Sequence, residues 1–287
     1  MKTIRLLAVD MDGTLLSPDG TVSRANADAI RSIQQAGVRV AVCTGRSFHD
    51  ASLPVKAAGL VCDFICMNGA ACYGKDGKQT GKITIPVGKQ RRILELAEEF
   101  GLATDLMGED CSYTTQTREA FRESYEAGIL LPMAELDFAS VEERFTFLSR
   151  QELEARGVDI YKISVMHRSS ELLGEVRAVL EAEGGLALAA SHETNLEITS
   201  SFAQKGRALV EYAKKNQIEL HEIMAIGDSG NDVSMLSLPL GFSVSMGNAM
   251  EEAKRAARFE TKTNAQDGVA WALEELLHLD QFVLSVS

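Results

Sequence analysis

The sequence lacks two features that would indicate a large anionic partner: an apolar run of membrane-spanning length and an excess of basic residues. Its 287 residues include 29 Lys and Arg against 41 Asp and Glu, which gives a formal net charge of −12 at pH 7. Nucleic acids and anionic membranes bind clustered Lys and Arg, so we expect neither as the main partner. A small anionic metabolite is not excluded, because a site can supply its own cation and backbone N–H groups.

Cysteine is also scarce. The five cysteines are odd in number, and three of them lie in or beside strand-like apolar runs, so we expect reduced core residues. A zinc site at Cys62 and Cys66 is not favoured, because these two residues lack a second pair or a nearby His. The apolar run that starts at Leu6 ends at Asp10, too early for the hydrophobic stretch of a signal peptide. These patterns predict a cytoplasmic protein.

Short apolar runs alternate with helical patterns at both ends of the chain. The pattern predicts strands over 4–9, 38–43, 64–67, 223–226 and 242–246, and helices over 24–35, 47–56, 204–215, 251–257 and 268–277. This alternation is typical of right-handed β-α-β units around a parallel sheet. The expected fold class is therefore α/β, with a Rossmann-like parallel sheet.

The middle of the chain follows a different pattern. Helices are predicted over 89–100 and 170–183, with an alternating strand over 161–167 and a hairpin turn near 74–82 before them. We interpret 86–190 as an inserted α+β domain, and 1–85 with 191–287 as the core.

Four predicted strands of the core end in polar or glycine-rich segments. These segments are D-M-D-G-T at 10–14, T-G-R at 44–46, N-G-A at 68–70 and G-D-S-G-N-D at 227–232. Ligands of an open parallel sheet bind outside the carboxyl ends of its strands, so we expect the four segments to share one crevice.

Asp10 and Asp12 suit the two tasks of phosphoryl transfer. Side chains two positions apart on an extended chain point to the same side, so both carboxylates can address one phosphorus atom. Asp10 is ionised at neutral pH and can act as a nucleophile without a separate base. Asp12 can protonate the leaving alkoxide and later take a proton from water. Gly13 permits a tight turn whose N–H groups face a phosphate.

Asp228 and Asp232 add two carboxylates to the same crevice, where they repel one another unless a cation lies between them. Oxygen ligands without His favour Mg²⁺. We expect Asp10, Asp228 and the backbone carbonyl of Asp12 to bind the metal. Asp232 is expected to orient metal-bound water or the loop.

The phosphate itself needs donors of hydrogen bonds. Thr44 offers a hydroxyl, Gly45 a backbone N–H and Lys205 a positive charge. Each motif alone has a plainer interpretation: Lys205 as a solvated surface residue, or the segment 227–232 as a helix N-cap loop. Their order at predicted strand ends favours a single phosphoryl-transfer site.

This ordered set of motifs resembles the haloacid dehalogenase superfamily of phosphatases, and specifically its Cof-type (class IIB) branch. The resemblance also covers Lys205-Gly206, M-G-N-A at 246–249 and N-A-Q-D-G-V-A at 264–270. It implies Asp10 as nucleophile, Asp12 as acid and base, and the inserted region as the α/β cap of that branch. The remaining site positions that we assign are Asp228 for the metal, Met11, Thr44, Gly45, Lys205 and Asn231 for the phosphate, and Asp232, Arg46 and Asn68 as supporting residues.

The spacing of the motifs supports the position of the cap. Asp10 and Thr44 are 34 positions apart, room for one helical crossover, whereas Thr44 and Lys205 are 161 positions apart. Two segments depart from the family pattern: residues 201–204 before Lys205, and a late strand that Glu260 interrupts.

The expected function is hydrolysis of small phosphorylated metabolites, such as sugar or cofactor phosphate monoesters, by a Mg²⁺-dependent phosphatase through an aspartyl phosphate. One alternative is a phosphomutase or phosphotransferase of the same superfamily, although its usual cap lies between the first two motifs. Others are a phospho-aspartate signalling protein and a non-catalytic metabolite-binding protein. The cap sequence does not identify the substrate, and the chain is expected to be a monomer or homodimer.

Overall fold

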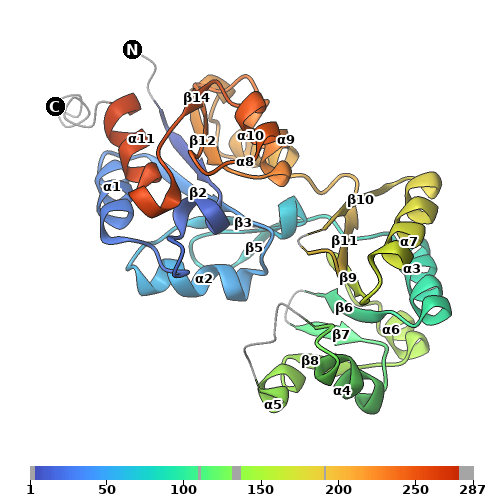
Figure 1. Ribbon diagram of the computed structural model, residues 1–287. Helices are drawn as coiled ribbons and strands as arrows, with labels where there is room; N and C mark the ends of the chain where they lie inside the picture. Colours follow the sequence, from blue (N-terminus) through green and yellow to red (C-terminus); the bar gives the residue numbers. More distant parts are fainter. Residues whose placement is uncertain (1–3, 109–110, 131–136, 191, 278–287) are drawn as a thin grey trace. The chain divides into compact units, whose positions relative to one another are not determined.

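The computed structural model describes residues 4–108, 111–130, 137–190 and 192–277, which form two compact units (Figure 1). The first unit contains the described residues of 1–82 and 203–287, and the second contains those of 83–202. The chain enters the second unit once and leaves it once. The second unit is therefore an insertion into the first.

The first unit is built on an eight-stranded sheet. Its six strands from β14 to β3 are parallel, and β4 and β5 continue the sheet as antiparallel strands. Strand β1 lies at the centre between β12 and β2, and all four of its residues are buried, as expected for a strand covered on both faces. The strand order is β14 (Phe259–Glu260), β13 (Phe242–Ser245), β12 (Ile223–Gly227), β1 (Leu6–Val9), β2 (Arg39–Cys43), β3 (Asp63–Cys66), β4 (Ala71–Tyr73) and β5 (Gln79–Lys82).

Helices α1, α2, α9 and α10 connect consecutive parallel strands of the first unit, whereas α8 precedes β12 and α11 follows β14. Leu6 and Ala8 of β1 share a hydrophobic core with Leu209 of α8 and Met235 of α9, while α1 packs against α11. A single helix, α1, lies between β1 and β2, as the short first interval predicts. The helices are α1 (Arg24–Gln35), α2 (Phe48–Ala57), α8 (Lys205–Lys215), α9 (Val233–Leu236), α10 (Glu251–Ala256) and α11 (Gly268–Leu277).

The described residues of the second unit form a six-stranded sheet and five α-helices. The helices and the sheet of this unit are drawn in Figure 1. Neighbouring strands are antiparallel except for β7 and β8. The sheet order is β10 (Leu186–Ala189), β11 (Asn195–Ser200), β9 (Lys162–Met166), β6 (Ala103–Met107), β7 (Ser112–Thr114) and β8 (Phe145–Phe147). The helices are α3 (Val87–Phe100), α4 (Arg118–Glu126), α5 (Phe138–Glu142), α6 (Arg150–Arg156) and α7 (Ser170–Glu183).

Both boundaries of the second unit differ from the expected ones. The unit ends after Phe202, later than the boundary expected after residue 190, because β11 pairs with both β9 and β10. It also begins at Ile83, slightly before the expected start at 86.

Strand β9 does not show the expected alternation of buried and exposed residues, because it is buried along its whole length. Its first residue, Lys162, is covered and pairs with Glu197 at 3.1 Å.

None of the helices formed by the described residues has both the length and the hydropathy needed to cross a membrane. All five cysteines are free thiols, and Cys43, Cys62 and Cys66 are buried. Burial raises the pKa of the Cys62 thiol to about 12, so this side chain behaves as a core residue.

Candidate active site

The loops that follow β1, β2, β3 and β12 carry the side chains of the candidate site. Asp10 ends β1 in an extended conformation, with φ −68° and ψ 163°, and a tight turn over Met11–Leu15 follows it. The turn is closed by Gly13, whose φ of 73° lies in the left-handed region that favours glycine. Thr14 donates a hydrogen bond from its hydroxyl to Asp228 Oδ1 at 2.7 Å. The turn after β1 is therefore linked to the loop after β12.

Lys205 lies between two carboxylates at the start of α8. Its Nζ is 2.6 Å from Asp10 Oδ1 and 2.7 Å from Asp232 Oδ1, and its side chain is fully buried. Taken in isolation, a lysine at a helix start is by default solvated, so the complete burial of Lys205 is a finding of the structure. The two carboxylates outweigh the cost of burial and raise the pKa of Lys205 above its ordinary value.

Asp232 fixes the loop after β12. Its Oδ2 accepts hydrogen bonds from the backbone N–H groups of Asp228 and Ser229, each at 3.0 Å, while its Oδ1 binds Lys205. Gly227 allows this approach, since a Cβ atom there would lie 2.6 Å from the Asp232 carboxyl carbon. Both carboxylate oxygens of Asp232 are thus engaged, one by Lys205 and the other by the backbone of its own loop.

Three carboxylates gather around this point. Asp10, Asp228 and Asp232 each place an oxygen within 4.8 Å of the others. Burial, followed by the charge of Asp232, holds the pKa of Asp10 well above its ordinary value, and burial also raises the pKa of Asp228. Three carboxylates facing one ammonium group leave negative charge in excess, and all donors are oxygens. The site therefore fits a hard divalent cation.

Asp12 occupies a different environment. The Arg46 guanidinium binds the Asp12 carboxylate in a bidentate manner, with Nε 2.9 Å from Oδ2 and Nη2 2.5 Å from Oδ1. The Asp12 side chain is 57% exposed, whereas Asp10 is buried, so the two carboxylates differ in solvation. The hydrogen bond to Asp12 raises the pKa of the Arg46 guanidinium. The T-G-R motif alone does not indicate a partner for Arg46. The structure shows that Arg46 binds Asp12.

The phosphate-binding candidates lie in the neighbouring loops. Thr44 is fully buried, and its Oγ1 accepts the N–H of Arg46 at 3.1 Å, which leaves its hydroxyl hydrogen for another acceptor. Asn231 donates to Asn68 Oδ1 at 3.1 Å, which links the loops after β3 and β12. Met11 is fully buried, so only its backbone is suited to contact a phosphate.

Gly45 lies beside the same pair of loops. A Cβ atom at Gly45 would lie 3.2 Å from Asn68 Oδ1, which indicates a close approach of these two loops. Met67 and Asn68 both adopt positive φ, 49° and 57°, and Gly69 follows at 100°. Three consecutive residues in this region form a strained turn, as is common near functional sites.

Gly13→Ala is expected to lower kcat about 10-fold or more, because an added Cβ would collide with the Asp228 carboxylate. Gly20→Ala is the matched control, since Gly20 has a similar φ of 78° and no neighbour within 4 Å of an added Cβ. Both variants carry the backbone cost of roughly 1–2 kcal/mol for a left-handed alanine. Steady-state kinetics should separate them, and equal kcat values for the two would contradict the close contact.

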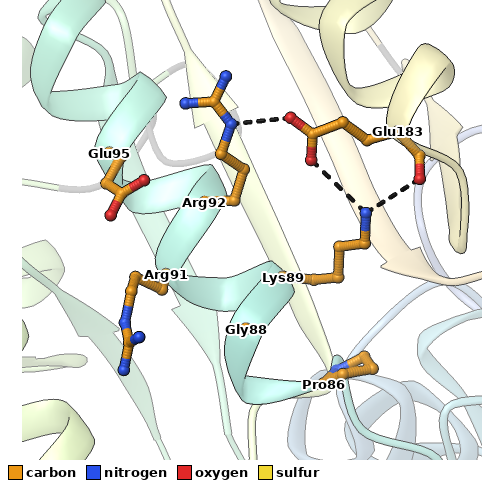
Figure 2. A pocket seen from close by; sticks show the side chains of 7 residues that line it. All are labelled: Pro86, Gly88, Lys89, Arg91, Arg92, Glu95 and Glu183. Atoms are coloured by element: carbon orange, nitrogen blue, oxygen red, sulfur yellow. Dashed lines mark hydrogen bonds and ion pairs between the residues drawn. The ribbon is translucent and has the colours of Figure 1, made fainter.

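The second unit has a pocket of its own, of about 440 Å³, lined by α3 and the end of α7 (Figure 2). Lys89 and Arg92 both bind Glu183 there, with Arg92 Nε 2.8 Å from Oε1. Arg91, which also lines the pocket, binds Glu154. Each basic side chain of this pocket already has a carboxylate partner, so the carboxylate-lined site of the first unit remains the candidate for phosphoryl chemistry.

Comparison with known proteins agrees with this geometry. A family model described as haloacid dehalogenase-like hydrolase matches residues 7–273. The chain is 33% identical over 288 residues to phosphatase YwpJ of Bacillus subtilis, covering 96% of this chain and 100% of that protein. It is 29% identical over 296 residues to 5-amino-6-(5-phospho-D-ribitylamino)uracil phosphatase YwtE of Bacillus subtilis, covering 96% and 98%. A solved haloacid dehalogenase-like hydrolase from B. subtilis has a TM-score of 0.80 and 32% identity, covering 95% and 100%.

The chain belongs to the haloacid dehalogenase-like hydrolase family. The match extends over nearly the whole length of each relative, so the relatives share the long insertion as well as the core. The expected α/β fold, the haloacid dehalogenase superfamily and the class of phosphatase are confirmed.

Proposed function

We propose that the protein is a Mg²⁺-dependent phosphatase that hydrolyses phosphate monoesters of small metabolites through an aspartyl phosphate on Asp10. The observation that carries this proposal is the position of Asp10. It follows the central strand, its Oδ1 lies 2.6 Å from Lys205 Nζ, and its carboxylate lies within 4.8 Å of Asp228. A carboxylate placed beside an ammonium group and a cation site is suited to attack a phosphorus centre whose negative charge these groups offset.

The reaction then proceeds in two displacements. A carboxylate oxygen of Asp10 forms a bond to phosphorus as the ester bond breaks, and Asp12 gives its proton to the leaving alkoxide. Asp12 next takes a proton from a water molecule, which attacks the same phosphorus and releases inorganic phosphate. Asp10 is regenerated as a carboxylate and Asp12 as the acid. Arg46 binds both oxygens of the ionised Asp12 carboxylate, so this contact fits the second step, in which Asp12 takes a proton from water.

Asp10 and Asp228 would hold the metal ion, together with the backbone carbonyl of Asp12. Asp232 is less suited to this task, since Lys205 and two backbone N–H groups already occupy its oxygens. Bound Mg²⁺ would supply positive charge against the phosphoryl oxygens. Thr44, Gly45, Asn231 and the backbone at Met11 would bind the same oxygens through hydrogen bonds.

The second unit would act as the cap that selects the substrate, and the relative named for a phospho-ribitylamino-uracil substrate supports a small phosphate monoester. A panel of sugar phosphates and cofactor phosphates, ranked by kcat/KM, would identify the preferred class. A phosphotransferase would instead transfer the phosphoryl group to an added alcohol. Equal yields of inorganic phosphate and dephosphorylated product would distinguish hydrolysis from transfer.

Removal of divalent metal is expected to abolish hydrolysis of a generic aryl phosphate, because Asp10, Asp228 and Asp232 would then repel both one another and the phosphate. Added Mg²⁺ in excess of EDTA should restore the rate. Circular dichroism in EDTA should show retained secondary structure, so that lost activity is not unfolding. Full turnover in chelator would contradict the proposed metal dependence.

A further inference from the structure

Three asparagine side chains hold the turn that follows Asp10. Asn248 Nδ2 donates to the carbonyl of Gly13 at 2.8 Å, Asn26 Nδ2 to Leu15 at 3.3 Å, and Asn264 Nδ2 to Leu16 at 2.9 Å. We call Asn26, Asn248 and Asn264 the asparagine brace. Its members come from α1, from the loop after β13 and from the loop after β14. Three distant segments thus converge on one turn.

The brace is itself fixed in orientation. Asn248 Oδ1 accepts the backbone N–H of Asn264 at 2.9 Å, and Asn26 Oδ1 accepts that of Ala270 at 2.9 Å. Each of these two amides therefore donates to a carbonyl on one side and accepts from an N–H on the other. Only one orientation of the amide satisfies both bonds, so its NH₂ group must face the turn.

The contact with Gly13 is the one that bears on chemistry. Gly13 joins Asp12 to Thr14, and Thr14 donates to Asp228 at 2.7 Å. Glycine has the widest backbone freedom, so rotation of the peptide after Gly13 is restrained poorly by the residue itself. Rotation of this peptide would move the Thr14 hydroxyl away from Asp228 and change the direction of the Asp12 side chain. A hydrogen bond to the Gly13 carbonyl opposes that rotation directly.

We propose that Asn248 is a positioning residue for phosphoryl transfer, which sets the Gly13 peptide and thereby the placement of Asp12 and Thr14. This inference rests on the proposed function. The hydrogen bonds of the Asn248 side chain go to the Gly13 carbonyl and the Asn264 N–H, so Asn248 acts on Asp12 and Thr14 through the turn. Its loss should therefore lower kcat and leave KM nearly unchanged, because geometry needed in the transition state is lost while ground-state binding is retained.

The test compares two substitutions at Asn248 with one elsewhere. Asn248→Ala removes both hydrogen bonds, and the isosteric Asn248→Asp keeps an acceptor for Asn264 but loses the donor to Gly13. Asn216→Ala is the matched control, because Asn216 Nδ2 donates to the Tyr212 carbonyl at the same distance of 2.8 Å, at the end of α8. Each variant is assayed with an aryl phosphate and Mg²⁺.

Both Asn248 variants are expected to lose roughly 10–100-fold in kcat, with KM changed by less than about threefold. Asn216→Ala should keep kcat within about twofold of the wild type. Fluorescence of Trp271, the single tryptophan, checks in every sample that the first unit is folded. If Asn248→Ala does not fold, Asn248→Asp decides the outcome, since it retains the shape and one of the two bonds.

Kinetics equal to those of Asn216→Ala, or a loss confined to KM, would overturn the role of Asn248. So would full activity in Asn248→Asp, because the donor to Gly13 would then be dispensable. Failure of the proposed function looks different. In that case the wild type itself shows no aryl phosphate hydrolysis that depends on Asp10, before any asparagine is changed.

Discussion

Asp10→Asn is expected to lower kcat for aryl phosphate hydrolysis by at least about 10⁴-fold. An amide has the shape of the carboxylate but is not a nucleophile toward phosphorus, so the first displacement cannot occur. The fold should survive. Burial raises the pKa of Asp10 in the folded protein above its value in the unfolded chain, so the charged form is disfavoured in the folded protein. The free energy of unfolding of the wild type therefore falls as the pH rises above the pKa of Asp10 in the unfolded chain. Lys205 keeps Asp232 as a partner in the variant, so circular dichroism in EDTA should show the secondary structure of the wild type.

The matched control for this change is Asp19→Asn. Asp19 lies in an exposed turn between β1 and α1. Its Oδ1 accepts hydrogen bonds from the hydroxyl and the backbone N–H of Thr21. Its kcat should stay within about twofold of the wild type. A kcat for Asp10→Asn within a factor of about ten of the control would contradict the assignment of the nucleophile.

Lys205→Met is expected to have the largest effect on stability together with nearly complete loss of activity. Lys205 is fully buried between Asp10 and Asp232, and its removal leaves two carboxylates without a nearby compensating charge. Removal of one partner from a buried ion pair costs about 3–5 kcal/mol. Phosphoryl transfer also loses the positive charge that would offset the phosphate.

Urea titration followed by Trp271 fluorescence measures this cost in the first unit, because α11 carries the tryptophan. Lys214→Met is the matched control. Lys214 lies on α8, like Lys205, and pairs with Glu211, with side chains 66% and 64% exposed. Its loss should therefore change the free energy of unfolding by less than about 1 kcal/mol. Equal urea midpoints for the two variants would show that the buried triad contributes little.

The sequence predicts the core well because each of its strands is a short apolar run that ends in a distinctive polar segment. The helices over 24–35 and 268–277 are found with the predicted bounds. The four motif segments follow β1, β2, β3 and β12, as periodicity and the order of the motifs indicate. Their fine geometry depends on side chains that come from distant positions, which no local pattern encodes.

The sequence predicts the inserted unit less completely than the core. Strands β7 and β8 have three residues each, too few for a periodic signal, and β11 lies beyond the boundary expected after residue 190. One signal was present for α6. Ser149 and Glu152 form a capping box, a pattern that marks the start of a helix in the sequence itself.

The sequence indicates which side chains could form a site, but it does not predict their burial or their charge interactions. Lys205 is buried only because two carboxylates approach it from other loops, and the default interpretation of such a lysine is a solvated one. Thr14 and Asn248 lie inside recognised motifs, yet their contacts with Asp228 and Gly13 join positions more than 200 residues apart. The expected set of metal ligands remains a prediction.

Direct capture of the phosphoryl group tests the central claim. Enzyme quenched during turnover of an aryl phosphate with Mg²⁺ would be treated with borohydride, which reduces an acyl phosphate to an alcohol, and digested for mass spectrometry. We expect homoserine in place of aspartate at position 10, and none in the Asp10→Asn variant. Modification at another carboxylate, or rapid turnover with position 10 unmodified, would contradict the account.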